Sequence, residues 1–371
     1  MLAAGAQAAA QESRGLFTDA GDGKLDASEW LIDRKGFLPV PLLITEPAVG
    51  YGAGLGLLFV RGSIRERAEK SRESGHLVPP DLFGVVFAAT ENGTKFGGAG
   101  GMFSFDDDRL RYRGGVARMD VNIDFYGIGG RLSTGERKIG MHLDGWVSSQ
   151  QVLLHLAQSG NFVAAKWVYL DTGASFEPGQ PRPLLPPLSV ATRSSGAGLS
   201  FEHDSRDNLF TPSRGWVAGL DTLFYGPGIG SETTFQTYRA HLFAYTPLAK
   251  EKLVLGGRLD GRSARGDVPF YQLPFIAMRG IPAMRYQDEN TGVAEGELRW
   301  NFTPRWSLVG FYGLGRAWGT SDRFGEAATI VAKGVGARYL IARQLGLYVG
   351  ADVAWGPEET AFYLQVGSAW R

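Results

Sequence analysis

Residues 293–302 read VAEGELRWNF, and their side chains alternate between apolar and charged types. In a β-strand, successive side chains point to opposite faces. One face of this stretch therefore carries small or apolar residues, namely Ala294, Gly296, Leu298, Trp300 and Phe302. The other face carries Glu295, Glu297, Arg299 and Asn301. A strand with these two faces is expected to separate two environments, hydrocarbon on one side and water on the other.

Similar alternation runs through most of the chain on either side of this stretch. The clearest further runs are residues 252–262, 306–318, 331–341, 344–355 and 362–370. With Phe37 to Thr45 as the first strand, the pattern predicts sixteen strands, and the connections near the C-terminus alternate between tight and long. Bacterial membrane barrels have an even number of strands and such an alternation of connections. We therefore predict an all-β fold, a 16-stranded antiparallel transmembrane β-barrel.

The apolar faces of the last strands end in aromatic residues. Trp300, Trp355 and Trp370 occupy these positions, which is typical of the aromatic girdles that lie at membrane interfaces. A soluble β-sandwich also alternates and is the alternative. The girdle and the charged opposite face favour the membrane barrel.

The composition agrees with this interpretation. The chain has 53 glycines in 371 residues, 12% aromatic residues and no cysteine. The absence of cysteine excludes disulfides and thiolate metal sites. The 38 basic and 38 acidic residues balance, so charge gives no reason to expect binding to nucleic acid. No apolar run approaches the length of a transmembrane helix, whereas barrel strands need no such run.

The chain before the first strand divides into two parts. Residues 1–10 are mostly alanine and contain A-x-A patterns, so we interpret them as the remnant of a signal peptide. Residues 11–36 are polar and acidic, and we expect a short periplasmic segment that plugs or covers the barrel mouth. The barrel itself is predicted over residues 37–371.

The polar segment contains half of a calcium-binding pattern. Residues 22–26 read DGKLD, with Glu29 after them, which matches the second half of a calcium loop. The first half does not match, because Thr18 and Ala20 occupy the first and third ligand positions. We therefore expect no metal here.

Residues 263–292, between two clear strands, show no period. A loop of this length in a regular chain is usually functional or disordered. We expect it to fold back into the barrel and to place Arg279, Gly280 and Ile281 on the inner wall. A floppy surface loop is the alternative.

Several motifs together indicate a family. Arg279-Gly280 stands in a long loop five strands before an aromatic-rich C-terminus. Residues 204–208 read DSRDN, residues 211–216 read TPSRGW, and residues 296–299 read GELR. In these features the chain resembles the BamA/TamA superfamily of outer-membrane barrels, also called the bacterial surface antigen family. The resemblance covers residues 200–371 well and the first half weakly.

The resemblance implies sixteen strands with the Arg-Gly loop inside the barrel and Arg279 held by acidic groups. Glu297 is the expected partner, because it faces the lumen and a carboxylate can pair with a guanidinium in a bidentate way. The family often has a second acid on the next strand, where this chain has Gly313. Either the Arg279 pair is weaker in this chain, or Glu295 or Asp260 compensates for the missing acid.

A second interpretation of the lumen charges is possible. Glu297 and Arg299 could instead be ordinary lumen charges that pair across strands. Neither interpretation changes the expected fold.

The resemblance also implies a weak seam between the first and last strands, through which a client would pass. The predicted seam residues are Pro41 and Leu43 on the first strand, and Phe362, Leu364 and Trp370 on the last. Pro41 lacks an N–H donor, which weakens strand pairing. Members of the family that insert or secrete proteins carry POTRA modules before the barrel. Residues 11–36 are too few for such a module, so we expect the barrel-only branch.

The implied function is assistance with the insertion or translocation of a protein or lipid client at the bacterial outer membrane. A passive pore or structural barrel gated by the Arg279 loop is the alternative. The expected partners are outer-membrane lipid, the client and a separate periplasmic protein. The sequence is compatible with both a monomer and an oligomer. The five histidines have neither zinc-site spacing nor a G-x-S-x-G companion. We expect no enzyme activity and no cofactor.

Overall fold

The structure is a computed structural model that describes most of the chain. The described residues are 17–32, 36–74, 76–128, 139–156, 160–176, 189–250, 252–320 and 322–370. The signal remnant predicted at residues 1–10 lies outside them.

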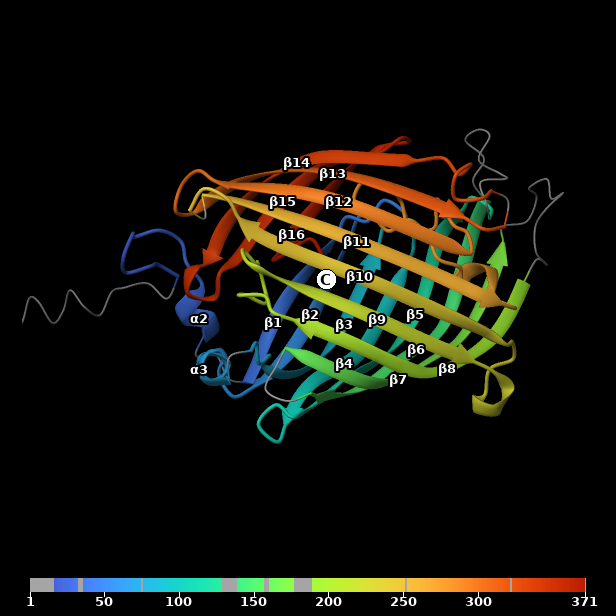
Figure 1. Ribbon diagram of the computed structural model, residues 1–371, viewed down its shortest axis with the longest axis horizontal. Helices are drawn as coiled ribbons and strands as arrows, with labels where there is room; N and C mark the ends of the chain where they lie inside the picture. The colour runs from blue at the N-terminus through green and yellow to red at the C-terminus, as the bar shows by residue number, and fades with distance from the viewer. Residues whose placement is uncertain are drawn as a thin grey trace, which may run out of the picture.

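Within the described residues, sixteen strands form one antiparallel sheet in which each strand pairs with its neighbours in the sequence. The sheet curls into a barrel of strongly tilted strands (Figure 1). The strands are β1 (Gly36–Ile44), β2 (Gly52–Arg61), β3 (Asp81–Thr90), β4 (Lys95–Phe105), β5 (Leu110–Phe125), β6 (Ile139–His155), β7 (Asn161–Phe176), β8 (Ser189–Asp204), β9 (Gly215–Tyr225), β10 (Phe235–Pro247), β11 (Leu253–Gly266), β12 (Asn290–Asn301), β13 (Trp306–Trp318), β14 (Ile330–Ala342), β15 (Leu347–Trp355) and β16 (Thr360–Val366). The predicted fold class is confirmed.

Five short helical segments lie outside the strands, one before β1 and four in the connections. They are α2 (Ser28–Ile32), α3 (Ile64–Ser74), η1 (Pro227–Ile229), η2 (Phe270–Gln272) and η3 (Arg343–Leu345), all within the described residues. Among those residues, no helix is both long enough and apolar enough to cross a membrane.

The two ends of the barrel differ. The helices α2 and α3 lie at one end (Figure 1), together with η3, which lies in the connection between β14 and β15. We call this the turn end. The opposite end carries the connection between β11 and β12, residues 267–289, and we call it the loop end.

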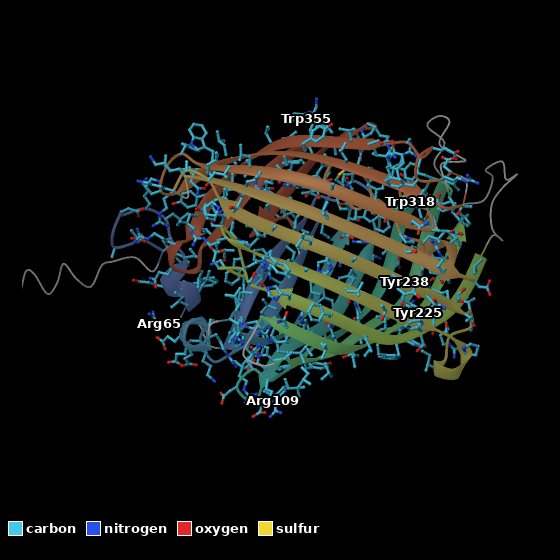
Figure 2. The ribbon with its side chains drawn as sticks, in the orientation of Figure 1. Arg65, Arg109, Tyr225, Tyr238, Trp318 and Trp355 are labelled. Atoms are coloured by element: carbon cyan, nitrogen blue, oxygen red, sulfur yellow. The ribbon has the colours of Figure 1, made fainter. Side chains whose placement is uncertain are left out.

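The two faces of β12 are as predicted. Ala294, Leu298 and Trp300 are exposed on the outside, whereas Glu295 and Arg299 are buried inside. In the same way, Trp355 at the end of β15 is exposed on the outer surface (Figure 2). The wall therefore presents apolar side chains outward and charged side chains inward, as the alternation indicates.

Two features do not follow from the alternation. The charged connection between β2 and β3 contains α3. The strand expected over residues 344–355 begins only at Leu347, because η3 occupies residues 343–345 and Gly346 takes a left-handed conformation with φ 61°. A glycine reaches this conformation without a steric penalty.

Trp370 is not part of the outer aromatic girdle, and this prediction was wrong. The chain leaves β16 at Gly367, which has φ 78°, and the N–H of Ser368 donates to the carbonyl of Phe210 at 2.6 Å. Trp370 then lies inside, 4% exposed. It packs against Val217, Phe243 and Tyr245. Alternation predicts a face only while the strand continues, and here the strand ends at Val366.

Candidate functional site: the infolded loop and the sheet edges

The loop between β11 and β12 folds into the barrel, as predicted. Its two arms contact each other through a bridge between Phe275 and Gln287. The N–H of Ile276 also donates to the carbonyl of Tyr286 at 2.9 Å. The apex packs on the inner wall through Ile276, Met278 and Ile281 of the loop and Val293, Ile330 and Ala332 of the wall. Full burial of an apolar side chain contributes about 1.5–3 kcal/mol, so this contact alone favours the infolded position.

Arg279 lies next to this apolar contact and is almost completely buried. Its Nη1 donates to Asp352 Oδ2 at 3.0 Å, and its Nη2 lies 2.8 Å from Glu297 Oε2. Its Nε lies 3.9 Å from Glu295 Oε1, and its guanidinium carbon lies 3.6 Å from the centre of the Phe311 ring. Three carboxylates and an aromatic face together compensate for the loss of hydration of the guanidinium.

Asp352 is the residue of this site whose contact with Arg279 could not be predicted from the sequence. It comes from β15, 73 residues later in the chain, and it is fully buried. Arg338 of β14 also binds it, with nitrogen–oxygen distances of 2.5 and 2.9 Å. The alternation of residues 344–355 places Asp352 in the lumen. It carries no information about which lumen residue lies opposite.

The packing of the loop explains why Gly313 stands where the family often has an acid. A Cβ at Gly313 would lie 2.4 Å from Met278 Sδ and 2.9 Å from Glu295 Cγ. At Gly315, two residues along the same face, a Cβ would lie 2.6 Å from Ile276 Cγ2. The loop therefore occupies the space of a side chain here, and Asp352 supplies a carboxylate from another strand.

Asp260 contributes to Arg279 only indirectly. Its partners are Arg239, Arg258 and Arg262, with nitrogen–oxygen distances of 2.8, 3.1 and 3.1 Å. Arg258 in turn pairs with Glu295 at 2.6 Å. Asp260 thus belongs to a chain of ion pairs that crosses β10, β11 and β12 and reaches Arg279 through Glu295.

Gly280 allows the loop to approach the wall closely. It has φ 85°, and a Cβ there would lie 3.2 Å from Ala354 Cβ. A Cβ at Gly356 would lie 2.0 Å from the carbonyl oxygen of Gly280. The N–H of Gly280 donates to Tyr363 Oη on β16 at 2.9 Å. The Arg-Gly pair therefore combines a buried charge with a backbone that contacts the last two strands.

β1 and β16 are the two edges of the sheet. Each has one neighbour in the strand order, and no ladder joins them in the part of the chain that the structure describes. The predicted seam residues Leu43, Phe362 and Leu364 are exposed on these edges. Trp370 lies off the edge, inside the barrel.

The infolded loop contacts both edges at the loop end. Gly280 binds Tyr363 of β16, and three residues later the N–H of Ala283 donates to Glu46 Oε1 at 3.3 Å. Glu46 lies two residues after β1. Since three residues span at most about 10 Å, these bonds hold the two edges close together. We call residues 280–286 the strap.

The strap also binds the turn between β15 and β16. Arg285 Nε donates to Glu358 Oε1 at 3.0 Å, and the hydroxyl of Tyr286 donates to the same oxygen. Burial and the Glu358 carboxylate raise the pKa of Tyr286, so its hydroxyl keeps the proton that it donates. Burial likewise raises the pKa of Glu46.

Arg299 serves a different contact from the one expected. Its Nη2 donates to the carbonyl of Pro212 at 3.2 Å and to Ser213 Oγ at 2.7 Å. These residues belong to the connection between β8 and β9, which carries the DSRDN motif. In that motif, Asn208 Nδ2 donates to the carbonyl of Leu345 at 2.8 Å. This connection is thus tied to β12 through Pro212 and Ser213, and to η3 through Asn208 of the motif.

The segment resembling half a calcium loop binds an arginine. Arg305, between β12 and β13, is fully buried. Its nitrogens lie 2.8 Å from Asp19, 2.7 Å from Asp22 and 2.5 Å from Asp26. The hydrogen bond from Arg305 lowers the pKa of Asp22 to about 2. The aspartates therefore fix residues 19–32 onto the turn end, and we call this segment the latch.

We compared the chain with known proteins. No family model matches the sequence, and no curated protein matches it. The structure is similar to solved barrels. One is BamA from Haemophilus ducreyi lacking POTRA domains 1–3, with a TM-score of 0.60 and 12% identity over 90% of this chain and 70% of that one.

Two CdiB structures are also similar. CdiB from Acinetobacter baumannii has a TM-score of 0.55 and 11% identity, and the match covers 89% of this chain and 59% of that one. CdiB from Escherichia coli has a TM-score of 0.53 and 14% identity, and covers 88% and 61%. The chain therefore has the fold of the BamA and CdiB barrels, which confirms the resemblance at the level of fold.

Proposed function

We propose that the protein acts in the bacterial outer membrane and assists the insertion or translocation of a protein or lipid client through the seam between β1 and β16. The observation that carries this proposal is the pair of sheet edges without a common ladder, held together by the strap. An edge strand can pair with a strand of another chain by β-augmentation.

The small number of hydrogen bonds made by the strap favours a seam that opens without unfolding of the barrel. Hydrogen bonds to Tyr363, Glu46 and Glu358 connect the strap to the two edges. Opening of the seam then requires the loss of a few hydrogen bonds at the loop end, each contributing about 0.5–1.5 kcal/mol, or up to about 3 kcal/mol where a charged group takes part. A fully paired ladder would require many more.

A passive pore is the second candidate. The lumen contains a cavity of about 320 Å³ lined by Lys166, Asp221, Arg239 and Arg262, whose mixed charges predict little ion selectivity. The infolded loop, the Arg279 ion pairs and Trp370 all occupy the lumen. They favour a closed barrel, so we expect flickering rather than steady large currents in planar bilayers.

A cross-link across the seam tests the main proposal. The chain contains no cysteine, so the pair Leu43→Cys and Phe362→Cys can be joined by a short bifunctional thiol reagent in cells. The proposal predicts loss of outer-membrane assembly or lipid export in the producing strain, measured from its outer-membrane proteins and lipids.

The matched control is the pair Val353→Cys and Phe362→Cys. These residues face each other in the ladder between β15 and β16, so their cross-link leaves the seam free and is expected to leave function intact. If the seam cross-link forms fully and the outer membrane stays unchanged, the seam mechanism is wrong. The proposal includes neither enzyme activity nor a cofactor.

A further inference from the structure

Two histidines and an aspartate converge at the turn end, away from the strap. His76 follows α3, Asp108 lies in the connection between β4 and β5, and His155 ends β6. One ligand atom of each lies within 4.8 Å of the others. Figure 2 labels Arg65, on α3, and Arg109, next to Asp108, at this part of the molecule.

The three side chains are closely packed. His76 Nε2 lies 2.7 Å from Asp108 Oδ2, and the ring centres of the two histidines are 4.3 Å apart. The His155 ring also stacks on Phe162 at 4.5 Å. His76 and Asp108 have almost completely buried side chains. The cluster is therefore assembled from two connections and the end of β6, and it is held in place by its surroundings.

Arg111 fixes the carboxylate of Asp108. Its Nε donates to Oδ1 at 2.7 Å and its Nη2 to Oδ2 at 2.6 Å, and Nη2 also donates to the carbonyl of Leu77 at 2.7 Å. Carboxylates that bind metals commonly receive such hydrogen bonds from a second group, which orient them. The arrangement is that of an oriented ligand.

The backbone that presents Asp108 is unusual. Asp106, Asp107 and Asp108 have φ values of 52°, 48° and 73°, in a region that residues other than glycine seldom adopt. Asp107 points to solvent, whereas Asp108 is 4% exposed. Backbone strain of this kind persists where the surrounding structure enforces it and is common at functional sites.

We propose that His76, Asp108 and His155 bind one divalent transition metal ion, with Zn²⁺ as the expected ion. Two imidazoles and a carboxylate suit zinc, whereas calcium and magnesium prefer oxygen ligands. Tetrahedral bonds of about 2.0–2.1 Å to nitrogen or oxygen place ligand atoms about 3.3 Å apart. The contact between His76 and Asp108 would open slightly, and water would take the fourth position.

Arg111 already pairs with the carboxylate of Asp108, and its positive charge opposes a bound cation. We therefore expect a dissociation constant for Zn²⁺ in the micromolar range, weaker than that of a closed structural zinc site. The ion would join the connection carrying α3 to β5 and β6. The proposal does not depend on the seam mechanism.

The test uses the full chain without a polyhistidine tag, folded in detergent and stripped with a chelator. After dialysis against micromolar ZnCl₂, elemental analysis is expected to give one zinc per chain, and none with CaCl₂-only buffer. Co²⁺ is expected to give the visible absorption of a four-coordinate site. This spectrum needs no variant, so it remains informative if a substitution prevents folding.

The double variant His76→Ala and His155→Ala is expected to lose the zinc and the cobalt spectrum. His142→Ala is the matched control. His142 also lies near an aspartate, 3.7 Å from Asp120, but it is not one of the three proposed ligands. This variant is expected to retain the zinc and the cobalt spectrum. Without zinc or a cobalt spectrum in the original chain, the cluster is only a polar contact between connections, and the proposal fails. Equal zinc in the double variant also overturns it.

Discussion

A buried guanidinium is stable in a protein only when carboxylates and hydrogen bonds replace its water. Arg279 has Asp352, Glu297 and Glu295 around it, and the apolar residues beside it fill the space next to Gly313. The charged contact and the apolar contact therefore depend on each other, because both require the loop to stay in one position on the wall.

Gly313→Ala tests the apolar half of this contact. A Cβ at this position would overlap Met278 Sδ, at 2.4 Å, and overpacking of this kind costs about 1–3 kcal/mol. We expect that decrease in the free energy of unfolding, measured by urea denaturation in lipid vesicles. Met278→Ala should lessen the cost of Gly313→Ala, so that the double variant loses less stability than the two single variants together.

Gly310→Ala on the same strand is the matched control. A Cβ there meets nothing within 4 Å, so we expect a change below about 0.5 kcal/mol. Equal decreases in the free energy of unfolding for Gly310→Ala and Gly313→Ala would show that the substitution acts on the backbone of the strand and not on its contact with the loop.

At this scale, the sequence predicted individual residues better than their partners. Alternation placed Glu297 and Asp352 in the lumen, and the resemblance singled out Arg279. The pairing of Arg279 with Asp352 depends on how far the loop enters the barrel and on the curvature of the wall. Neither quantity is encoded in the period of a strand.

The latch is the element whose role in the structure differs most from what its sequence pattern suggests. Its carboxylates match half a calcium loop in sequence, and they converge on a guanidinium in the structure. Arg305 is 0% exposed at the centre of Asp19, Asp22 and Asp26. The latch also packs by apolar contacts, with Ile32 buried against Ala342 and Leu345.

The pH dependence of the latch follows from Asp22. Its pKa is lowered from 3.8 to about 2 by the hydrogen bond from Arg305. A lowered carboxyl pKa stabilises the docked latch above the ordinary pKa, and this stabilisation is lost as the pH falls through the lowered value. Hydrogen exchange, corrected for intrinsic rates, should show residues 19–32 protected from pH 7 down to about 4. Protection should decrease as the pH approaches 2.

Arg305→Gln removes the cation that lowers this pKa. We expect the latch to exchange rapidly already at pH 7 in this variant, while strands β12 and β13 stay protected. Arg316→Gln, at the loop end of β13, is the control and should leave the latch protected. A latch that stays protected in Arg305→Gln would mean that the apolar contacts of Ile32 suffice.

Elements with regular alternation were predicted, and elements that depend on tertiary contacts were not. All sixteen strands follow from the period of two, whereas α3, η3 and the inward turn at Gly367 do not. Trp370 looks like a girdle residue by its position in the pattern. It lies inside the barrel because the N–H of Ser368 donates to the carbonyl of Phe210, and this bond turns the end of the chain inward.

For the whole molecule, the barrel is one sheet whose two edges, β1 and β16, meet without a ladder among the described residues. The strap connects these edges through Tyr363 and Glu46, and Arg279 holds the base of the strap to the inner wall. We therefore expect the ion pairs inside the barrel to control the geometry of the proposed seam on its outside. The similarity of fold to BamA and CdiB barrels agrees with this architecture, and the number of strands could be predicted from the sequence.

The most direct test of this account is the distance across the seam, measured by electron spin resonance between labels at Leu43→Cys and Leu364→Cys in lipid vesicles. We expect one narrow distance distribution in the original background and in Arg118→Ala, whose ion pair with Asp144 is half exposed. In Arg279→Ala we expect a longer and broader distribution, because the strap loses its anchor. The same narrow distribution in Arg279→Ala, in a barrel shown to be folded, would contradict the account.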